Sequence, residues 1–186
     1  MKNLVFVLGL ISLIFLSFFG FRPANKSGVM SSIIIETVSK RLYKKYGLML
    51  SSIGGGAREG RYWVINADYR RYNSEVLNME DARKLILDVV DEYLNEINSR
   101  KDFRPYMESY PFVPRNIGVN VFLYNEKGEL RRLPEISDVG ICAGIISYGS
   151  HGPKIKLPYA RMIEETYDEA IERVKEGSSS RDIILQ

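Results

Sequence analysis

The chain has 186 residues and a formal net charge of +3, from 26 Lys and Arg residues against 23 Asp and Glu residues. Its composition, 45% hydrophobic and 26% charged, is that of an ordinary globular protein and excludes a largely disordered chain. The two signs of charge are mixed along the sequence, which argues against nucleic-acid binding. With one cysteine, Cys142, and one histidine, His151, the sequence excludes an internal disulfide and a zinc site built from several histidines. It contains no cofactor motif, so none is expected.

The N-terminus begins MKNLVFVLGLISLIFLSFFGFRPANKSG, and the 18 residues from Leu4 to Phe21 carry no charge. This length reaches the lower limit for a bilayer-spanning helix and exceeds the apolar core of a typical signal peptide. A cleavage site needs small residues at positions −3 and −1, yet Phe18 or Arg22 falls at −3 for cuts within residues 20–24. We therefore expect residues 1–24 to anchor an exported domain in the membrane. The alternative is a cleaved signal peptide and a secreted domain.

Three segments show the periodicity of helices within one globular domain, residues 25–177. Apolar residues four apart predict a helix over residues 30–46. The clearest helix begins at Asn78, a good N-cap. Its apolar stripe consists of Ala82, Leu85, Ile86, Val89, Tyr93 and Ile97. A third helix is predicted over residues 159–177, with a loose tail at residues 178–186.

Alternating apolar residues predict about five strands, at residues 48–53, 61–69, 116–124, 129–133 and 136–149. Most are joined by short turns, and their spacing is too short for regular β–α–β crossovers. The sequence therefore predicts an α+β domain with a mostly antiparallel sheet and about three helices on one face, preceded by the hydrophobic N-terminal helix.

The glycine-rich segment GGGAREG, residues 54–60, invites comparison with phosphate-binding loops. Such loops need a helix directly behind the glycines, so that free backbone N–H groups face the phosphate. Here an alternating, strand-like run follows instead. We therefore interpret the segment as a hairpin loop.

Cys142 and His151 are the only candidates for a nucleophile and base of the thiol type, with Asp138 or Asp168 to orient the imidazole. Ser150 beside His151 is a second possible pair, although no G-x-S-x-G motif surrounds it. Cys142 lies in an apolar alternating run, where a free cysteine is usually a small buried hydrophobe. The carboxylates of the two later helices fall opposite the apolar stripes, as on solvated faces.

The segment RKDFRPYMESYPFVPRN, residues 100–116, carries three prolines and four aromatic rings. A flexible linker is rich in Gly and Ser and poor in rings, so we expect a stiff, covered connection between a helix and a strand. Tyr106 and Phe112 are predicted to be buried. The sharper hypothesis is an aromatic binding groove formed by Arg104, Tyr106, Tyr110 and Phe112.

The pieces MEDARKLILDVVDEYLNEIN, FRPYMESYPFVPRNIGVNVF and GIISYG together resemble a family of small, uncharacterised bacterial proteins with a hydrophobic N-terminal segment. The resemblance covers about residues 60–175, and its RPY and YPF pieces carry it. It implies an exported or anchored domain and no particular catalytic residue. The sequence thus favours a non-enzymatic interaction or envelope module with an unknown protein partner. The alternative is a small hydrolase that uses Cys142 or Ser150 with His151.

Overall fold

The computed structural model describes residues 26–152 and 161–184, in which six strands form a single sheet. The strands are β1 (Met49–Arg58), β2 (Arg61–Tyr72), β3 (Ile117–Tyr124), β4 (Asp138–Cys142), β5 (Ile145–Ser150) and β6 (Arg161–Thr166). The helices are α2 (Lys26–Tyr46), α3 (Met79–Ser99) and α4 (Tyr167–Ile184), with two 3₁₀ turns, η1 (Arg104–Tyr106) and η2 (Pro114–Asn116). The predicted α+β class is confirmed.

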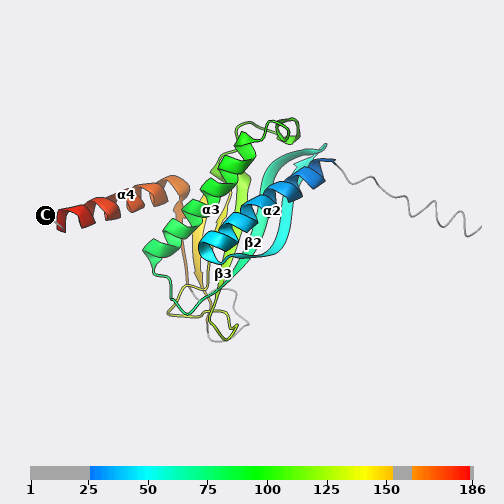
Figure 1. The fold of residues 1–186 in the computed structure, drawn as a ribbon. Coiled ribbons are helices and arrows are strands. Elements are labelled where there is room, and N and C mark those ends of the chain that lie inside the picture. Colours follow the sequence, from blue (N-terminus) through cyan, green and yellow to red (C-terminus); the bar gives the residue numbers. More distant parts are fainter. Residues whose placement is uncertain (1–25, 153–160, 185–186) are drawn as a thin grey trace, which may run out of the picture.

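The strands lie in chain order, β1-β2-β3-β4-β5-β6, and every neighbouring pair except one is antiparallel. The exception is β2 and β3, which run parallel because α3 crosses the sheet between them. The prediction that the chain holds no such crossover was therefore wrong at this one place. Figure 1 shows α2 and α3 side by side over the same face of the sheet, with α4 projecting from the β6 end.

The two long helices form where the apolar spacing predicts them. Asn78 caps α3, because its Oδ1 accepts a hydrogen bond from the backbone N–H of Asp81 at 2.9 Å. Beneath the helices, the hydroxyl of Tyr69 lies 2.8 Å from Ser39 Oγ and 2.6 Å from the hydroxyl of Tyr93. This buried chain links α2, β2 and α3, so that the polar atoms of the core satisfy one another.

The predicted N-terminal helix lies outside the described residues. Within the described ranges, residues 26–152 and 161–184, no helix combines the length and the low charge that a membrane span requires.

The sheet gains two strands over the prediction, because residues 136–149 form two strands rather than one and residues 161–166 form β6. β4 and β5 are joined by Ala143 and Gly144, both with positive φ (51° and 83°), which is the geometry of a tight two-residue hairpin turn. The predicted strand at residues 129–133 is absent, apart from a single bridge between Tyr124 and Leu130. Residues 136–149 were predicted as one strand because their apolar alternation continues unbroken across the turn at Ala143 and Gly144.

The C-terminal helix begins later and ends later than predicted. Residues 161–166 pair with β5 as β6, and α4 starts at Tyr167 and continues past Gly177 to Ile184. Glu169 Oε2 accepts hydrogen bonds from the backbone N–H and the hydroxyl of Thr166, at 2.7 and 2.9 Å. Thr166 and Glu169 thus form a T-x-x-E capping arrangement that fixes the start of α4.

The glycine-rich segment belongs to β1, and the predicted hairpin loop shrinks to Glu59 and Gly60, with φ of 52° and 78°. A Cβ at Gly56 would collide with the indole ring of Trp63, and one at Gly55 would crowd the ring of Tyr62. The glycines are therefore strand residues whose missing side chains make room for the rings of β2.

The proline-rich connection is covered in its inner part, as predicted. Phe103 and Phe112 are buried, and Tyr106 is partly buried against the same core. Asn98 holds Phe112 by two hydrogen bonds, from Nδ2 to the carbonyl at 2.9 Å and from the backbone N–H to Oδ1 at 2.8 Å. Tyr110, by contrast, is 49% exposed.

Candidate functional site

The middle of the sheet face opposite α2 and α3 is polar. On β2, Ala67 and Tyr69 point into the core, so Asn66 and Asp68 point the other way. The β2–β3 register places Gly118 beside Asn66 and Asn120 beside Asp68. No helix of the described residues covers this open face (Figure 1), and its polar residues are the candidate site.

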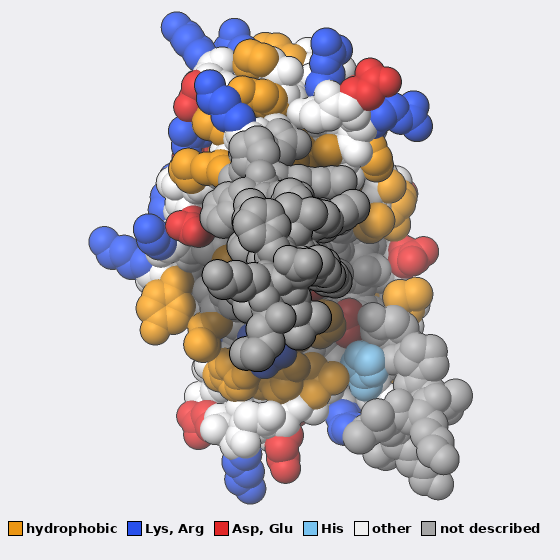
Figure 2. Space-filling view, turned by 90° about the vertical axis from the view of Figure 1, so that its right-hand side faces the viewer, with side chains coloured by type: hydrophobic (Ala, Val, Ile, Leu, Met, Phe, Trp, Pro, Cys, Tyr) orange, Lys and Arg blue, Asp and Glu red, His pale blue; other side chains and the backbone are white. Residues whose placement is uncertain are grey.

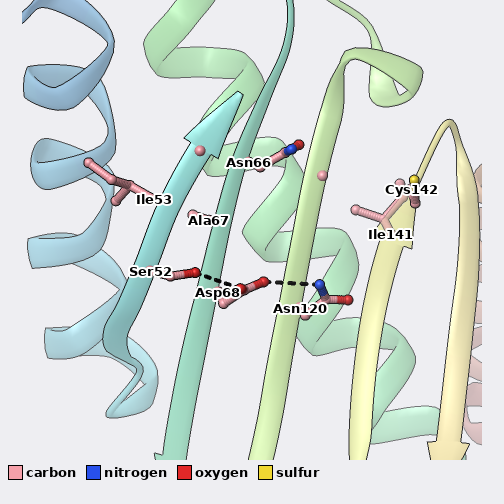
Figure 3. Close-up of a pocket in the computed structure, with 10 residues that line it drawn as sticks. Ser52, Ile53, Asn66, Ala67, Asp68, Asn120, Ile141 and Cys142 are labelled. Carbon is pink, nitrogen blue, oxygen red and sulfur yellow. Dashed lines mark hydrogen bonds between the residues drawn. The ribbon is translucent and has the colours of Figure 1, made fainter. Parts of the chain in front are cut away.

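Three side chains of the open face form a hydrogen-bonded row across β1, β2 and β3 (Figure 3). Ser52 Oγ donates to Asp68 Oδ2 at 2.6 Å, and Asn120 Nδ2 donates to Asp68 Oδ1 at 3.0 Å. The strand registers continue the same row through Gly140 on β4 and Ser147 on β5. The row fixes the orientation of the Asp68 carboxylate, because both of its oxygens are bonded to neighbours.

Glycines leave room on this face for the side chains of the neighbouring strands. A Cβ at Gly118 would collide with Oδ1 of Asn66, and a Cβ at Gly140 would collide with Oδ1 of Asn120. Each asparagine thus lies over a glycine of the following strand. The amides form the floor of a shallow trough, where any larger side chain would displace them.

The trough encloses about 350 Å³. Its lining residues are Ser52, Ile53, Gly54, Asn66, Ala67, Asp68, Gly118, Asn120, Ile141 and Cys142. The Cys142 side chain lies at the β4 end of this lining (Figure 3). Cys142 is exposed, so the expectation that it is a buried strand residue was wrong. It follows the core residue Ile141 on β4, so its side chain points to the open face rather than into the core.

The predicted catalytic candidates fall into two separate places. The β4–β5 register sets Cys142 opposite Ile145 at the turn end of the hairpin, whereas His151 follows the far end of β5. Six residue steps separate these levels, which is about 20 Å at roughly 3.3 Å per residue. Cys142 and His151 therefore do not meet. Ser150, next to His151, is buried with 2% of its surface exposed.

One predicted pair does come together. His151 Nε2 lies 3.4 Å from Asp138 Oδ1, and the backbone N–H of His151 donates to Ser137 Oγ at 2.8 Å. Asp138 is only 5% exposed, and burial raises the pKa of its carboxyl, an effect that the neighbouring imidazole partly offsets. Asp168, the other proposed orienting residue, lies in the first turn of α4.

The aromatic groove predicted for residues 100–116 is not formed as a groove. Arg104 stacks on the Tyr110 ring, 4.2 Å from its centroid, and donates a hydrogen bond from Nη2 to the Tyr110 hydroxyl at 2.6 Å. Tyr106 and Phe112 instead pack toward the core. Of these four residues, Arg104 and Tyr110 are the exposed ones that could contact a partner.

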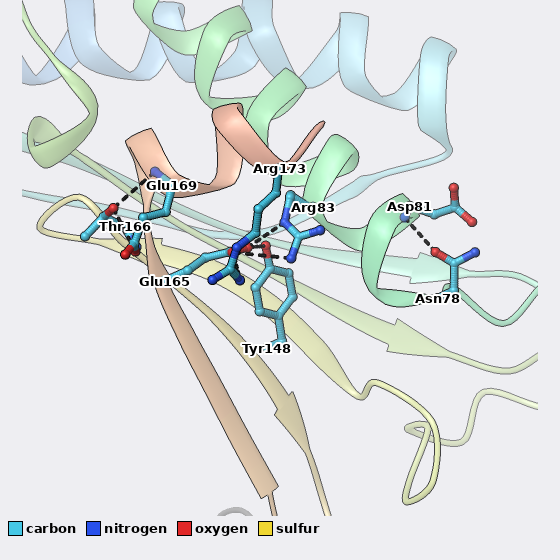
Figure 4. A network of polar contacts seen from close by, with 8 residues as sticks. All are labelled: Asn78, Asp81, Arg83, Tyr148, Glu165, Thr166, Glu169 and Arg173. Carbon is cyan, nitrogen blue, oxygen red and sulfur yellow. Dashed lines mark hydrogen bonds and ion pairs between the residues drawn. The ribbon is translucent and has the colours of Figure 1, made fainter. Parts of the chain in front are cut away.

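The structure also contains a buried ion network that the sequence analysis missed (Figure 4). Glu165 on β6 accepts hydrogen bonds from Arg83 on α3, Tyr148 on β5 and Arg173 on α4. Every donor is a neighbour from another element, and the Glu165 side chain is only 1% exposed. We assign the network a structural role, because the hydrogen bonds from Arg83, Tyr148 and Arg173 already engage both oxygens of the Glu165 carboxylate.

The carboxylates of α3 that were expected to be solvated are mostly engaged at the surface. Glu92 and Glu96 bind Arg41 of α2 at 2.8 and 2.9 Å, and Asp91 accepts a hydrogen bond from the Tyr167 hydroxyl at 2.7 Å. Among the described residues, no group of three or more His, Cys, Asp or Glu side chains is placed to hold a metal ion.

Comparisons with known proteins return nothing that resembles this chain: no family model, no curated protein and no solved structure matches it. The trough therefore has to be interpreted from its own chemistry.

Proposed function

We propose that the protein is a non-enzymatic binding module and that the open-face trough binds a neutral saccharide. The observation that carries this proposal is the side chain of Asn66. Its amide lies exposed on the glycine floor and makes no hydrogen bond to another described residue, although it offers both donors and an acceptor. Beside it, Asn120 and Ser52 are already held in place by Asp68.

The chemistry of the trough favours a ligand with many hydroxyl groups. An apolar ligand would strip water from exposed amides and a carboxylate without replacing their hydrogen bonds, which costs free energy. An anion would face Asp68, which has no ion pair within the described part of the chain. Sugar hydroxyls both donate and accept, so they can bond the amide, the carboxylate and the serine together.

Titration calorimetry with three neutral oligosaccharides, N-acetylchitotriose, cellotriose and maltotriose, tests the proposal. We expect one of them to bind and Asn66→Ala to weaken its binding by about tenfold, the size of one well-placed hydrogen bond. The matched control is Asn95→Ala, which makes the same change at an exposed position of α3. Equal affinity in both variants, or no binding of any of the three sugars at millimolar concentration, would contradict the proposal.

The proposed location is the cell envelope. The 18 uncharged residues from Leu4 to Phe21 support a membrane tether with the folded domain exported, or secretion if the segment is cleaved. Alkaline washing of membranes distinguishes these alternatives, because a tethered chain stays in the membrane pellet. A cleaved chain is released and lacks the N-terminal residues in its mass spectrum.

The hydrolase alternative is supported by one contact, the 3.4 Å approach of His151 to Asp138. Its two candidate nucleophiles are poorly placed, since Cys142 lies about 20 Å away along the hairpin and Ser150, next to His151, is buried. His151→Ala separates the two proposals: a binding module keeps its affinity for saccharide, whereas a hydrolase loses its turnover of ester or peptide substrates.

A further inference from the structure

The strand β1 is an edge of the sheet, and its only protections are a bulge near its start and Arg58 at its end. It has 10 residues, and its first nine, MLSSIGGGA, include no charge and no proline. Natural edge strands are normally kept from pairing by short length, charges, prolines or inward-pointing charged residues. The opposite edge, β6, follows this rule, with six residues that include the outer Glu164 and the buried Glu165. The two edges of one sheet thus differ, and β1 is the one open to another strand.

The surroundings of β1 are apolar and hollow. Ile53 is 53% exposed, and Tyr43 on the neighbouring flank of α2 is 61% exposed. Two hollows of about 300 and 460 Å³ lie between β1 and α2. Figure 2 looks onto the side of the molecule where β1 and α2 lie in Figure 1, and hydrophobic side chains are exposed on it around the grey residues.

We infer that β1 pairs with β1 of a second copy of the chain in antiparallel orientation. Residues 52–58 of the two copies form the shared ladder, and Arg58 of each copy reaches into the trough of the other. The interface meets the proposed saccharide site at Asp68, whereas the saccharide proposal is carried by Asn66. The interface itself needs no saccharide, and its test uses no ligand.

The register follows from the regular part of the strand. A bulge interrupts β1 near its start, between Leu50 and Ser52. From residue 52 to residue 58 every β1 residue pairs with β2, and the second irregularity is an extra residue on the β2 strand. A two-fold axis at Gly55 pairs this stretch with itself, setting Ile53 opposite the small Ala57. Ile53 and Ala57 both lie on the helix side, opposite Ala67 and Tyr62. This register therefore keeps the helices of both copies on one face.

Charge complementarity supports the same register. It places Arg58 of one copy opposite Ser52 of the other, whose hydroxyl donates to Asp68 on the next strand at 2.6 Å. Within the described residues, Arg58 forms no ion pair or hydrogen bond, and Asp68 has no cationic partner. The strands that carry Arg58 and Asp68 are two spacings apart, about 9.6 Å, and an extended arginine side chain can cross the intervening β1 to meet this carboxylate. Two such pairs form, one at each end of the ladder.

The helix layer fits a second copy as well. α2 contacts both β1 and β2, so it lies over the first two strands. Pairing β1 with its symmetry mate would bring the two α2 helices to within about 10 Å, close to the 8–10 Å of packed helices. Ile53 and the hollow of about 300 Å³ beside it lie along the ladder and would then be covered. A β6 edge that bears charges offers no such match to β1.

Disulfide trapping tests this inference on the full-length chain. In a Cys142→Ser background, Ile53→Cys and Ala57→Cys chains with tags of different size are expressed together, oxidised in the membrane or secreted fraction, and separated on a non-reducing gel. In the inferred register the two positions face each other with Cα atoms about 5 Å apart, within the range of a disulfide. The same position in the two copies, such as 53 and 53, is offset by four residues along the ladder, about 13 Å, so each variant alone stays monomeric on the gel.

We expect a mixed-tag dimer from co-expression and none from either variant alone. Adding Arg58→Glu should lower the yield of this dimer at least about fivefold, because it sets a carboxylate against Asp68. Arg61→Glu, at the same hairpin tip but on β2, should leave the yield unchanged. Far-UV circular dichroism confirms that each variant is folded. Dimers formed by Ile53→Cys chains alone would indicate another register. The absence of the mixed-tag dimer after co-expression would show that β1 is unpaired. Either result overturns the inference.

Discussion

Arg83 Nε on α3 lies 2.7 Å from Glu165 Oε1 on β6, and this buried ion pair joins the last strand to the central helix. The carboxylate also accepts from the Tyr148 hydroxyl at 2.5 Å and from Arg173 Nη1 at 2.6 Å. A buried charge is tolerated only when it is paired and hydrogen-bonded. The network therefore holds β6 and α4 against a domain whose other edge is open.

Glu165→Gln is expected to destabilise the domain by about 3–5 kcal/mol, because it leaves the buried Arg83 guanidinium without its counter-charge. Burial alone raises the pKa of Glu165, but the hydrogen bonds from Arg83 and Tyr148 outweigh it, so the pKa lies below its ordinary value. The carboxylate thus stabilises the fold above an unfolded pKa of about 4.3, and this contribution is lost as the pH falls through the folded pKa. Urea melts should show the wild-type advantage at pH 7 and a smaller one near pH 3. A constant difference would contradict this account.

The ionised carboxylate of Asp138 is expected to destabilise the fold, whereas that of Glu165 stabilises it. Burial raises the pKa of Asp138, so its ionised form costs stability above the folded pKa, and the cost disappears below the ordinary value of about 3.9. Asp138→Asn should therefore raise the melting temperature at pH 8, with a gain that shrinks as the pH falls toward 4. Glu126→Gln, the same change at an exposed turn, should alter stability little at any pH. A variant that is less stable than wild type at pH 8 would show that the contact with His151 dominates.

Phe112→Ala should lower the free energy of unfolding by about 3–5 kcal/mol, because the ring is 2% exposed and its removal leaves a cavity in the core. Tyr110→Ala, two residues earlier and 49% exposed, should cost about 1 kcal/mol or less, although it removes the stacking with Arg104. Chemical denaturation of both variants measures the contrast. Equal costs would mean that the connection is held by its exposed rings.

Cys142 is expected to react with a thiol reagent in the folded protein about as fast as in the unfolded chain, because it is exposed at the end of β4. Labelling with Ellman's reagent in buffer and in urea gives the two rates. A saccharide bound in the trough should slow the labelling of the folded protein, since Cys142 lines the same hollow. Slow labelling without ligand would indicate that Cys142 is covered in solution.

Much of the fold could be predicted because its signals are local. Asn78 caps α3 where its sequence position indicates, and residues with helical spacing such as Ile86 and Tyr93 are buried. At the start of α4, one signal was misread and another was overlooked. Ile163 and Tyr167 are four apart, which fits a helix, yet the first belongs to β6 and the second begins α4. Thr166 and Glu169 carried the boundary in their T-x-x-E spacing.

The candidate site could not be predicted in the same way. Asp68 and Asn120 are 52 positions apart in the chain, and they become neighbours only because α3 returns the chain to pair β3 in parallel with β2. No short motif records such a long-range register. The alternation of β2 does show that Asn66 and Asp68 share the face opposite Ala67. It cannot show that this face is left uncovered, because that depends on where both helices pack.

Deleting residues 1–24 is expected to leave a soluble domain with an unchanged melting temperature. In the described part of the chain, every buried hydrophobic residue of the core lies between Ile34 and Ala170. The deletion also spares α2, which begins at Lys26 and is held to α3 by the bonds of Arg41 to Glu92 and Glu96. Far-UV circular dichroism and a thermal melt of the truncated chain, compared with the full chain in mild detergent, provide the measurement. A truncated chain that lacks helical signal, or melts more than about 10 °C lower, would show that the N-terminal segment packs into the domain. A shift of that size in a domain of about 160 residues corresponds to several kcal/mol, more than a segment outside the packed core contributes.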